Sequence, residues 1–201
     1  MRKLLLTIAI LALTAGAATA EVLWDQSAYD PNWSGFWNSE SGCAPFGGTV
    51  HQANDIWFGD VVTITSVTTF YTPFDFGFEQ TTEAYLWIAP RTGNLPVDGV
   101  DEPHDPALLV PVSVVHDGVG AYMLKAEGLS IPLQSGEYWI SLTPIAPSGP
   151  WGPEFNITAL NPWGLETVAI EYCGMFAPAW GDLNENADAS ILIEGIIDVV
   201  P

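Results

Sequence analysis

The sequence predicts an all-β fold, an antiparallel β-sandwich or barrel formed by a single domain. Helix signals are nearly absent, because 19 glycines and 16 prolines are scattered along 201 residues and interrupt any long helix. Short runs rich in valine, isoleucine, threonine, tyrosine and tryptophan recur instead, and turn residues separate them. No internal repeat or linker divides the chain. We therefore expect one domain over residues 21–201.

The first twenty residues have the three-part layout of a secretory signal peptide. Arg2 and Lys3 give a positive start, residues 4–13 form an apolar run, and residues 18–20 (Ala-Thr-Ala) match a cleavage site. The apolar run is short for a bilayer span, which takes ~20 residues, although an uncleaved membrane anchor is the alternative. We expect cleavage after Ala20 and a secreted protein, periplasmic or extracellular, without a membrane span.

Alternating side chains predict the strands that follow. Residues 60–71 form a long strand whose apolar positions change parity, which predicts a β-bulge near residues 65–66. Residues 84–89 are apolar on both faces and are expected at the centre of a sheet. Further strands with one buried and one wet face are expected at 108–114, 129–133, 137–143, 167–173 and 189–197. Pro111 lies within the first of these, so we expect an edge strand there.

Charge restricts the partners of the exported chain. Beyond residue 20 there are 24 acidic residues but only two bases, Arg91 and Lys125. A negative field repels phosphate backbones and anionic lipids, so neither nucleic acid nor a membrane surface is an expected partner. The same field suits divalent cations or neutral partners such as polysaccharide. The two cysteines, Cys43 and Cys173, are expected to form a disulfide in an oxidising compartment, with two buried thiols as the alternative.

Three stretches carry a family resemblance. They are residues 52–58 with 62–67 (QANDIWF and VTITSV), residues 131–142 (IPLQSGEYWISL) and residues 188–195 (DASILIEG). In that order they resemble exported bacterial β-sandwich proteins of the PEP-CTERM-associated type. The resemblance implies a jelly-roll-like sandwich and says little about chemistry. The sorting tail of that family is absent before Pro201, so we expect release rather than covalent attachment to the cell surface.

Two acidic segments are candidate metal sites. Asp182, Asn184, Asn186 and Asp188 place oxygen ligands at alternate positions, as a Ca²⁺ loop does. The alternative is a hydrogen-bonded Asx turn leading into the last strand. A second acidic group lies within residues 98–105, where a solvated loop is the alternative: Asp98, Asp101, Glu102, His104 and Asp105. Ca²⁺ is the one cofactor that the sequence suggests.

The nine tryptophans divide into two groups. Four lie in strand-like runs and are expected mainly in the core: Trp24, Trp57, Trp87 and Trp139. Five lie in segments rich in glycine, proline and asparagine, where aromatic rings can stack on sugars: Trp33, Trp37, Trp151, Trp163 and Trp180. The alternative for the second group is that these rings close the ends of the sandwich, since each buries a large area.

No catalytic motif stands out, so the sequence favours a secreted, non-catalytic interaction module. Weak binding of carbohydrate or extracellular matrix through the loop tryptophans is its expected activity. A small secreted glycoside hydrolase is the first alternative, and Glu137 and Glu171 are its best pair of carboxylates. A Ca²⁺-stabilised structural surface protein is the second alternative.

Overall fold

A computed structural model confirms the all-β class. It describes residues 19–29, 35–37, 50–72, 78–96, 109–145, 155–157, 159, 168–171, 180–182 and 188–198. The elements in these ranges are β1 (Glu21–Asp25), β2 (Gly35–Trp37), β3 (Val50–Phe58), β4 (Val62–Thr72), the 3-10 turn η1 (Phe78–Gln80), β5 (Glu83–Pro90), β6 (Leu109–His116), β7 (Tyr122–Leu133), β8 (Gly136–Pro144), β9 (Phe155–Ile157), β10 (Val168–Glu171), β11 (Trp180–Asp182) and β12 (Ile191–Ile197). None of them is a helix long and apolar enough to cross a membrane.

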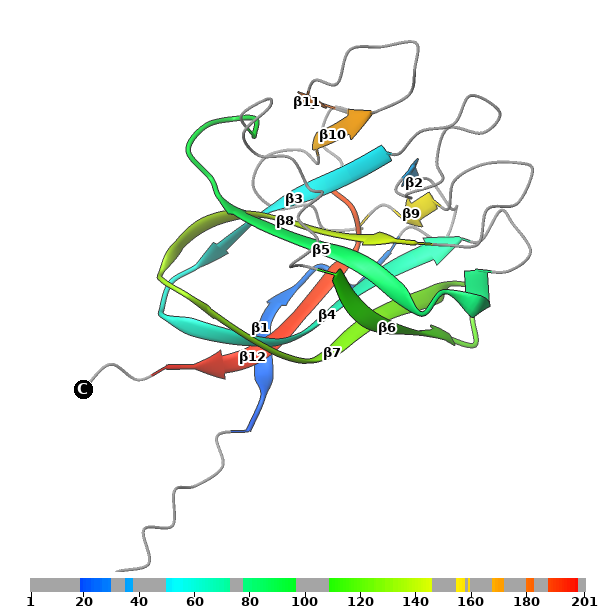
Figure 1. The fold of residues 1–201 in the computed structure, drawn as a ribbon, viewed down its shortest axis with the longest axis horizontal. Coiled ribbons are helices and arrows are strands. Elements are labelled where there is room, and N and C mark those ends of the chain that lie inside the picture. The colour runs from blue at the N-terminus through cyan, green and yellow to red at the C-terminus, as the bar shows by residue number, and fades with distance from the viewer. Residues whose placement is uncertain are drawn as a thin grey trace, which may run out of the picture.

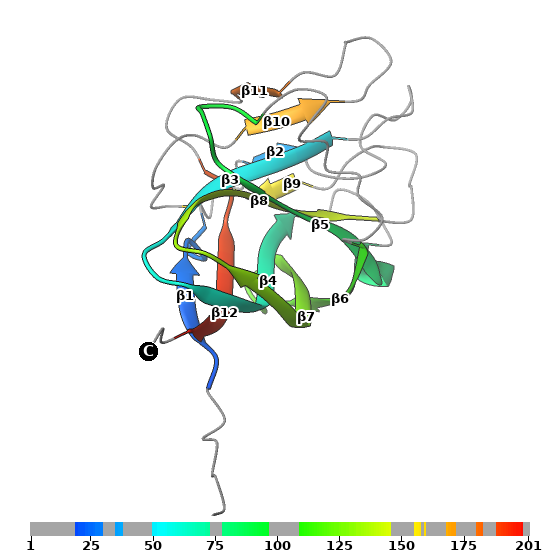
Figure 2. The same cartoon turned by 60° about the vertical axis from the view of Figure 1, so that its left-hand side comes forward.

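The strands form one antiparallel sheet that curls over on itself. Its order is β1-β12-β4-β7-β6-β5-β8-β3-β10-β11, and β9 joins β2 to the side of β4. From β1 round to β3, eight strands nearly close as a barrel, with β12, β4 and β7 in one half and β5, β8 and β3 in the other (Figures 1 and 2). The seam of this barrel lies between β1 and β3. Jelly-roll connectivity stays a prediction.

Strand β6 is the place where the sheet turns over, and it is not the edge strand that Pro111 predicted. Residues 109–111 pair with β5, whereas residues 112–116 pair with β7. Val112, directly after the proline, donates its N–H to the carbonyl oxygen of Thr82 at 2.9 Å. Proline removes one ladder hydrogen bond, but it does not prevent the strand from having a different partner on each side of it.

Strand β4 contains the bulge that its change of apolar parity predicted. Its register against β7 shifts between Ile64 and Ser66, and the register of β12 against β4 shifts between Glu194 and Gly195. An extra residue in a strand reverses the direction in which the following side chains point. Ile64 and Val67 are therefore both fully buried, although their sequence positions have opposite parity.

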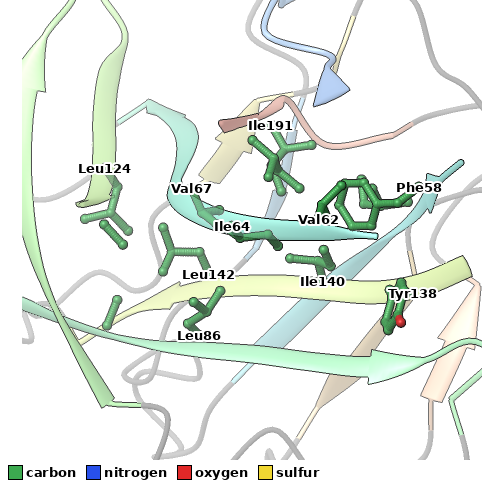
Figure 3. Close-up of a cluster of buried hydrophobic side chains, with 14 of the residues drawn as sticks. Phe58, Val62, Ile64, Val67, Leu86, Leu124, Tyr138, Ile140, Leu142 and Ile191 are labelled. Carbon is green, nitrogen blue, oxygen red and sulfur yellow. The ribbon is translucent and has the colours of Figure 1, made fainter. Parts of the chain in front are cut away.

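The core fills the space between the two halves of the sheet. Side chains from β4, β7 and β12 meet those from β3, β5 and β8, as the labelled residues in Figure 3 show. The fully buried members include Ile56, Ile64, Val67, Leu86, Leu124, Ile140, Leu142 and Ile193. Each large aliphatic side chain removed from water contributes about 1.5–3 kcal/mol to folding. The inward faces predicted for 129–133 and 137–143 are confirmed.

The outward face of β8 is also buried, which corrects the expectation of one wet face. Trp139, Ser141 and Thr143 alternate with the core residues of this strand, and all three are inaccessible to solvent. They form a polar layer in which His51 Nδ1 lies 3.0 Å from Thr143 Oγ1, and Ser141 Oγ lies 3.1 Å from that same hydroxyl. Alternation predicts that one face is buried, but it does not reveal whether the other face is covered.

The loop between β6 and β7 is held by the carboxylate of Asp117. Its Oδ1 accepts the backbone N–H groups of Val119, Gly120 and Ala121 at 2.8–3.0 Å. Its Oδ2 accepts the hydroxyl of Tyr29, which lies 88 residues earlier in the chain. That hydrogen bond, with burial and the nearby negative charge, raises the pKa of Tyr29 to about 12. Burial opposes the hydrogen bonds at Asp117, but together these bonds hold the pKa of its carboxyl below the usual value.

We expect Tyr29→Phe to lower the stability by about 1 kcal/mol at pH 7, which corresponds to a fall of ~3 °C in melting temperature. The folded pKa of Asp117 lies below its unfolded value of 3.8, so this contribution is present above pH 4 and is lost as the pH falls further. The folded pKa of Tyr29 lies above its unfolded value of 10, so the contribution is also lost between pH 10 and about 12. Melting curves of the wild type and of Tyr29→Phe from pH 2 to pH 11 test this. A difference in melting temperature that does not vary with pH would contradict the prediction.

Candidate functional site: an apolar groove at the barrel seam

None of the five side chains of the predicted tryptophan platform lies in the part of the chain that the structure describes. Trp33, Trp151 and Trp163 belong to segments without a described placement. Trp37 ends β2 and Trp180 begins β11, but only their backbone is described. Convergence of these five rings on one surface therefore stays a prediction. The same holds for the disulfide, because both Cys43 and Cys173 lie outside the described ranges.

Of the predicted Ca²⁺ ligands, only Asp188 has a described side chain. Asp182 ends β11, and Asn184 and Asn186 lie outside the described ranges, as does the 98–105 segment. Asp188 is 1% exposed, and its Oδ2 accepts a hydrogen bond from Gln26 Nε2 at 2.9 Å. This carboxylate links the entry of β12 to the end of β1. Among the residues with described side chains, no three histidines, cysteines or acids are grouped closely enough to hold a metal ion.

The two strand positions that carry the acids of the hydrolase alternative, Glu137 and Glu171, lie far apart along β3. Glu137 pairs with Trp57 at one end of β3, and Glu171 pairs with Val50 at the other end. Seven residues of an extended strand separate these partners, roughly 23 Å at ~3.3 Å per residue. Glycosidases hold their two carboxyl groups about 5–9.5 Å apart. The backbone positions of Glu137 and Glu171 are therefore too far apart for these two residues to flank one glycosidic bond.

The four strand tryptophans are not all in the core, and Trp57 is the exception. Trp139 and Trp87 are buried and Trp24 is partly buried, whereas Trp57 is 49% exposed. Its neighbours along β3 explain the difference. Ile56 and Phe58 both point into the core, so the residue between them must point outward. This alternation was readable in the sequence, and it is the signal by which Trp57 could have been found.

Trp57 borders an apolar groove at the seam between β1 and the end of β3. The groove has a volume of about 250 Å³. Three of its lining residues, Val22, Trp57 and Ile197, are large hydrophobic side chains exposed to solvent. The full lining is Val22, Leu23, Trp24, Trp57, Phe58, Gly59, Asp60, Val62 and Ile197. A gathering of exposed apolar side chains at one concave place is typical of a binding surface rather than of ordinary protein surface.

The short turn after β3, at Gly59 and Asp60, positions the indole of Trp57. A Cβ atom at Gly59 would lie 3.0 Å from Cη2 of Trp57 and 3.4 Å from its Cζ2, so the ring lies against the bare backbone of Gly59. A larger residue at this position would push the ring outward by a few tenths of an ångström. Asp60 follows in the same turn and lines the groove. The ring is thus supported on one side and open to solvent on the other.

Arg91 and two acids lie beside Trp57 on the outward face of the sheet. Glu137 is directly opposite Trp57 in the β3–β8 register. Arg91 Nη1 donates to Glu137 Oε2 at 2.9 Å and to Asp55 Oδ2 at 3.1 Å. The central guanidinium carbon of Arg91, Cζ, lies 5.6 Å from the ring centroid of Trp139. Asp55 is nearly inaccessible, whereas the side chain of Glu137 is 51% exposed.

Two carboxylates near Trp57 keep oxygen atoms that no described residue contacts. Glu137 uses only Oε2 in its contact with Arg91, and its Oε1 has no partner within the described part of the chain. Asp60 makes no hydrogen bond or ion pair with any other residue of that part. The indole N–H of Trp57 is likewise without an acceptor there. The arrangement offers one aromatic face, one donor and two carboxylates to a ligand.

A scan against models of known protein families, a search of curated proteins and a search of solved structures found no match to this chain.

Proposed function

We propose that the chain is an exported, non-catalytic interaction module that binds polysaccharide weakly at the seam groove, with Trp57 as its stacking platform. The observation that carries the proposal is the half-exposed indole of Trp57. The apolar face of a pyranose can cover that ring, and an indole buries a large area when it is covered. The proposal moves the expected sugar platform from the loop tryptophans to a strand tryptophan.

Polar groups around the ring suit the hydroxyl groups of a sugar. The carboxylates of Glu137 and Asp60 can accept hydrogen bonds, and the indole N–H can donate one. These groups are exposed, so each exchanges a hydrogen bond with water for one with the ligand and contributes little net free energy. One stacked ring with a few exposed polar contacts corresponds to a dissociation constant of about 1 mM.

Export is supported by the layout of the first twenty residues and by the place where the first strand starts. The first described strand, β1, begins at Glu21, one residue beyond the expected cleavage point. Thr19 and Ala20, which lie before that strand, are exposed. Removal of residues 1–20 would therefore leave the strand pairing of β1 with β12 in place, from Glu21 onward.

We expect Trp57→Ala to weaken binding of β-linked glucose oligosaccharides by at least about tenfold, which is the loss of ~1.4 kcal/mol of stacking. Titration of the purified protein with cellohexaose, followed by protein NMR shifts, measures this. Trp57→Phe should retain much of the affinity because it keeps a ring. Val119→Ala is the matched control, since Val119 is an exposed hydrophobic residue on the β6–β7 loop, outside the groove lining. Equal binding by wild type and Trp57→Ala would overturn the proposal.

A further inference from the structure

We propose that the groove selects cationic oligosaccharides, built from amino sugars with free ammonium groups, over neutral and anionic ones. This inference rests on the proposed function and names the substrate class of the same site. Two observations support it. Carboxylates lie near Trp57, and the two basic residues beyond residue 20, Arg91 and Lys125, are both already paired with acids.

Arg91 and Lys125 both form ion pairs with acidic residues of the chain. Arg91 contacts Asp55 and Glu137. Lys125 Nζ lies 2.8 Å from Glu127 Oε1 and 3.5 Å from Glu194 Oε2. An anionic sugar would therefore have to displace an internal carboxylate in order to find a positive partner. Uronic acids and sulfated sugars are disfavoured at the groove for this reason.

One acid with unused oxygens lines the groove, and a second lies next to its tryptophan across the strand pair. Glu137 is the cross-strand neighbour of Trp57, a position that places the Cβ atoms of such a pair about 5 Å apart. Asp60 lies three residues beyond Trp57, in the turn that supports the ring. An ammonium group on a sugar that stacks on the indole is within reach of either carboxylate. It also benefits from the negative face of the ring itself.

Solvent exposure limits the size of this preference and makes it depend on salt. Ion pairs at exposed positions contribute little, so we expect amino-sugar chains to bind about 3–10-fold more tightly than neutral ones at low ionic strength. Screening at ~0.5 M salt should remove most of the difference, because the Debye length then falls well below 10 Å. Stacking on Trp57 is apolar and should persist in salt.

The test compares hexamers of β-1,4-linked glucosamine, of β-1,4-linked glucose and of α-1,4-linked galacturonic acid at pH 5.5, where amines are protonated and carboxylates are ionised. The first two differ in one group per sugar, an ammonium in place of a hydroxyl. We expect the order glucosamine, glucose, galacturonate in low salt, and a loss of the glucosamine advantage in high salt. Asp60→Asn and Glu137→Gln should each reduce that advantage. Glu83→Gln is the control, since Glu83 is an exposed acid at the far end of β5.

The two proposals fail in different ways. Equal affinity for the glucosamine and glucose hexamers, or an advantage that Asp60→Asn and Glu137→Gln leave unchanged, would overturn the amino-sugar preference while polysaccharide binding at Trp57 still stands. Tighter binding of galacturonate would also overturn the preference. Absence of binding to all three hexamers would overturn the proposed function and this inference together.

Discussion

Gly195→Ala is expected to destabilise the protein by about 3 kcal/mol and to lower its melting temperature by ~10 °C. A Cβ atom at this position would lie 2.3 Å from the carbonyl oxygen of Thr63, 2.6 Å from Cδ1 of Leu23 and 3.1 Å from Cα of Ile64. Two of these three atoms belong to the backbone of β4, which cannot move aside as a side chain can. The strand must shift to admit one methyl group.

The position of Gly195 in the sheet explains why the cost should be large. Strand β12 lies between β1 and β4, and Gly195 pairs with Glu21 on one side and with Ile64 on the other. The register shift of β12 against β4 occurs directly before it. Moving β4 away from β12 would disturb the hydrogen bonds that β4 makes with β12 on one side and with β7 on the other.

Gly93→Ala is the matched control for this prediction. The nearest atom to a Cβ at Gly93 is 3.8 Å away, so the substitution meets only ordinary contacts and should change stability by less than ~0.5 kcal/mol. Urea denaturation and calorimetry of the two variants give the comparison. If Gly195→Ala melted within 2 °C of the wild type, the close approach of β1, β12 and β4 would be wrong.

Arg91→Met is expected to cost about 3 kcal/mol, because it removes the cation from a buried carboxylate. The side chain of Asp55 is 1% exposed, and Arg91 reaches it at 3.1 Å while it also contacts Glu137. Methionine keeps the apolar stem that packs near Trp139 but loses the charge. The contact with Glu137 should matter less, because half of that side chain is in water.

Lys125→Met is the control for Arg91→Met, and a double variant isolates the cause. Lys125 is one-third exposed, and its partners Glu127 and Glu194 are exposed to a similar or greater degree, so we expect a cost below ~1 kcal/mol. Adding Asp55→Asn to Arg91→Met should recover part of the lost stability, since the buried carboxylate that Arg91 contacts is then replaced by an uncharged amide. Equal costs for the two single variants would show that Asp55 is not effectively buried.

Local pattern alone predicted the all-β class and several of its details. The parity change between Ile64 and Val67 predicted the bulge in β4, and the two-faced apolar run at 84–89 predicted a central strand, which β5 is. The alternation at 137–143 identified the inward side chains of β8. Successive side chains of a β-strand point to opposite faces of the sheet. This alternation involves only neighbouring residues, so it can be recognised in the sequence.

The candidate site was predicted less well, because its residues come from different strands. The groove joins Val22 of β1, Trp57 of β3 and Ile197 of β12, and no spacing along the chain relates them. Trp57 was placed in the core by its residue type, although Ile56 and Phe58 on either side of it require it to point outward. Arg91 and Asp55 meet only because β5 and β3 lie on opposite sides of β8.

By itself the sequence determined the all-β class, the inward-facing side chains at 129–133 and 137–143, and the acidic charge that limits the partners. Only the tertiary structure decided which strands are neighbours, that β6 has partners on both sides of Pro111, and that the outward face of β8 is buried around Trp139 and Thr143. The physical reason is that alternation is a property of one strand, whereas pairing order and the covering of a second face depend on contacts between residues far apart in the chain.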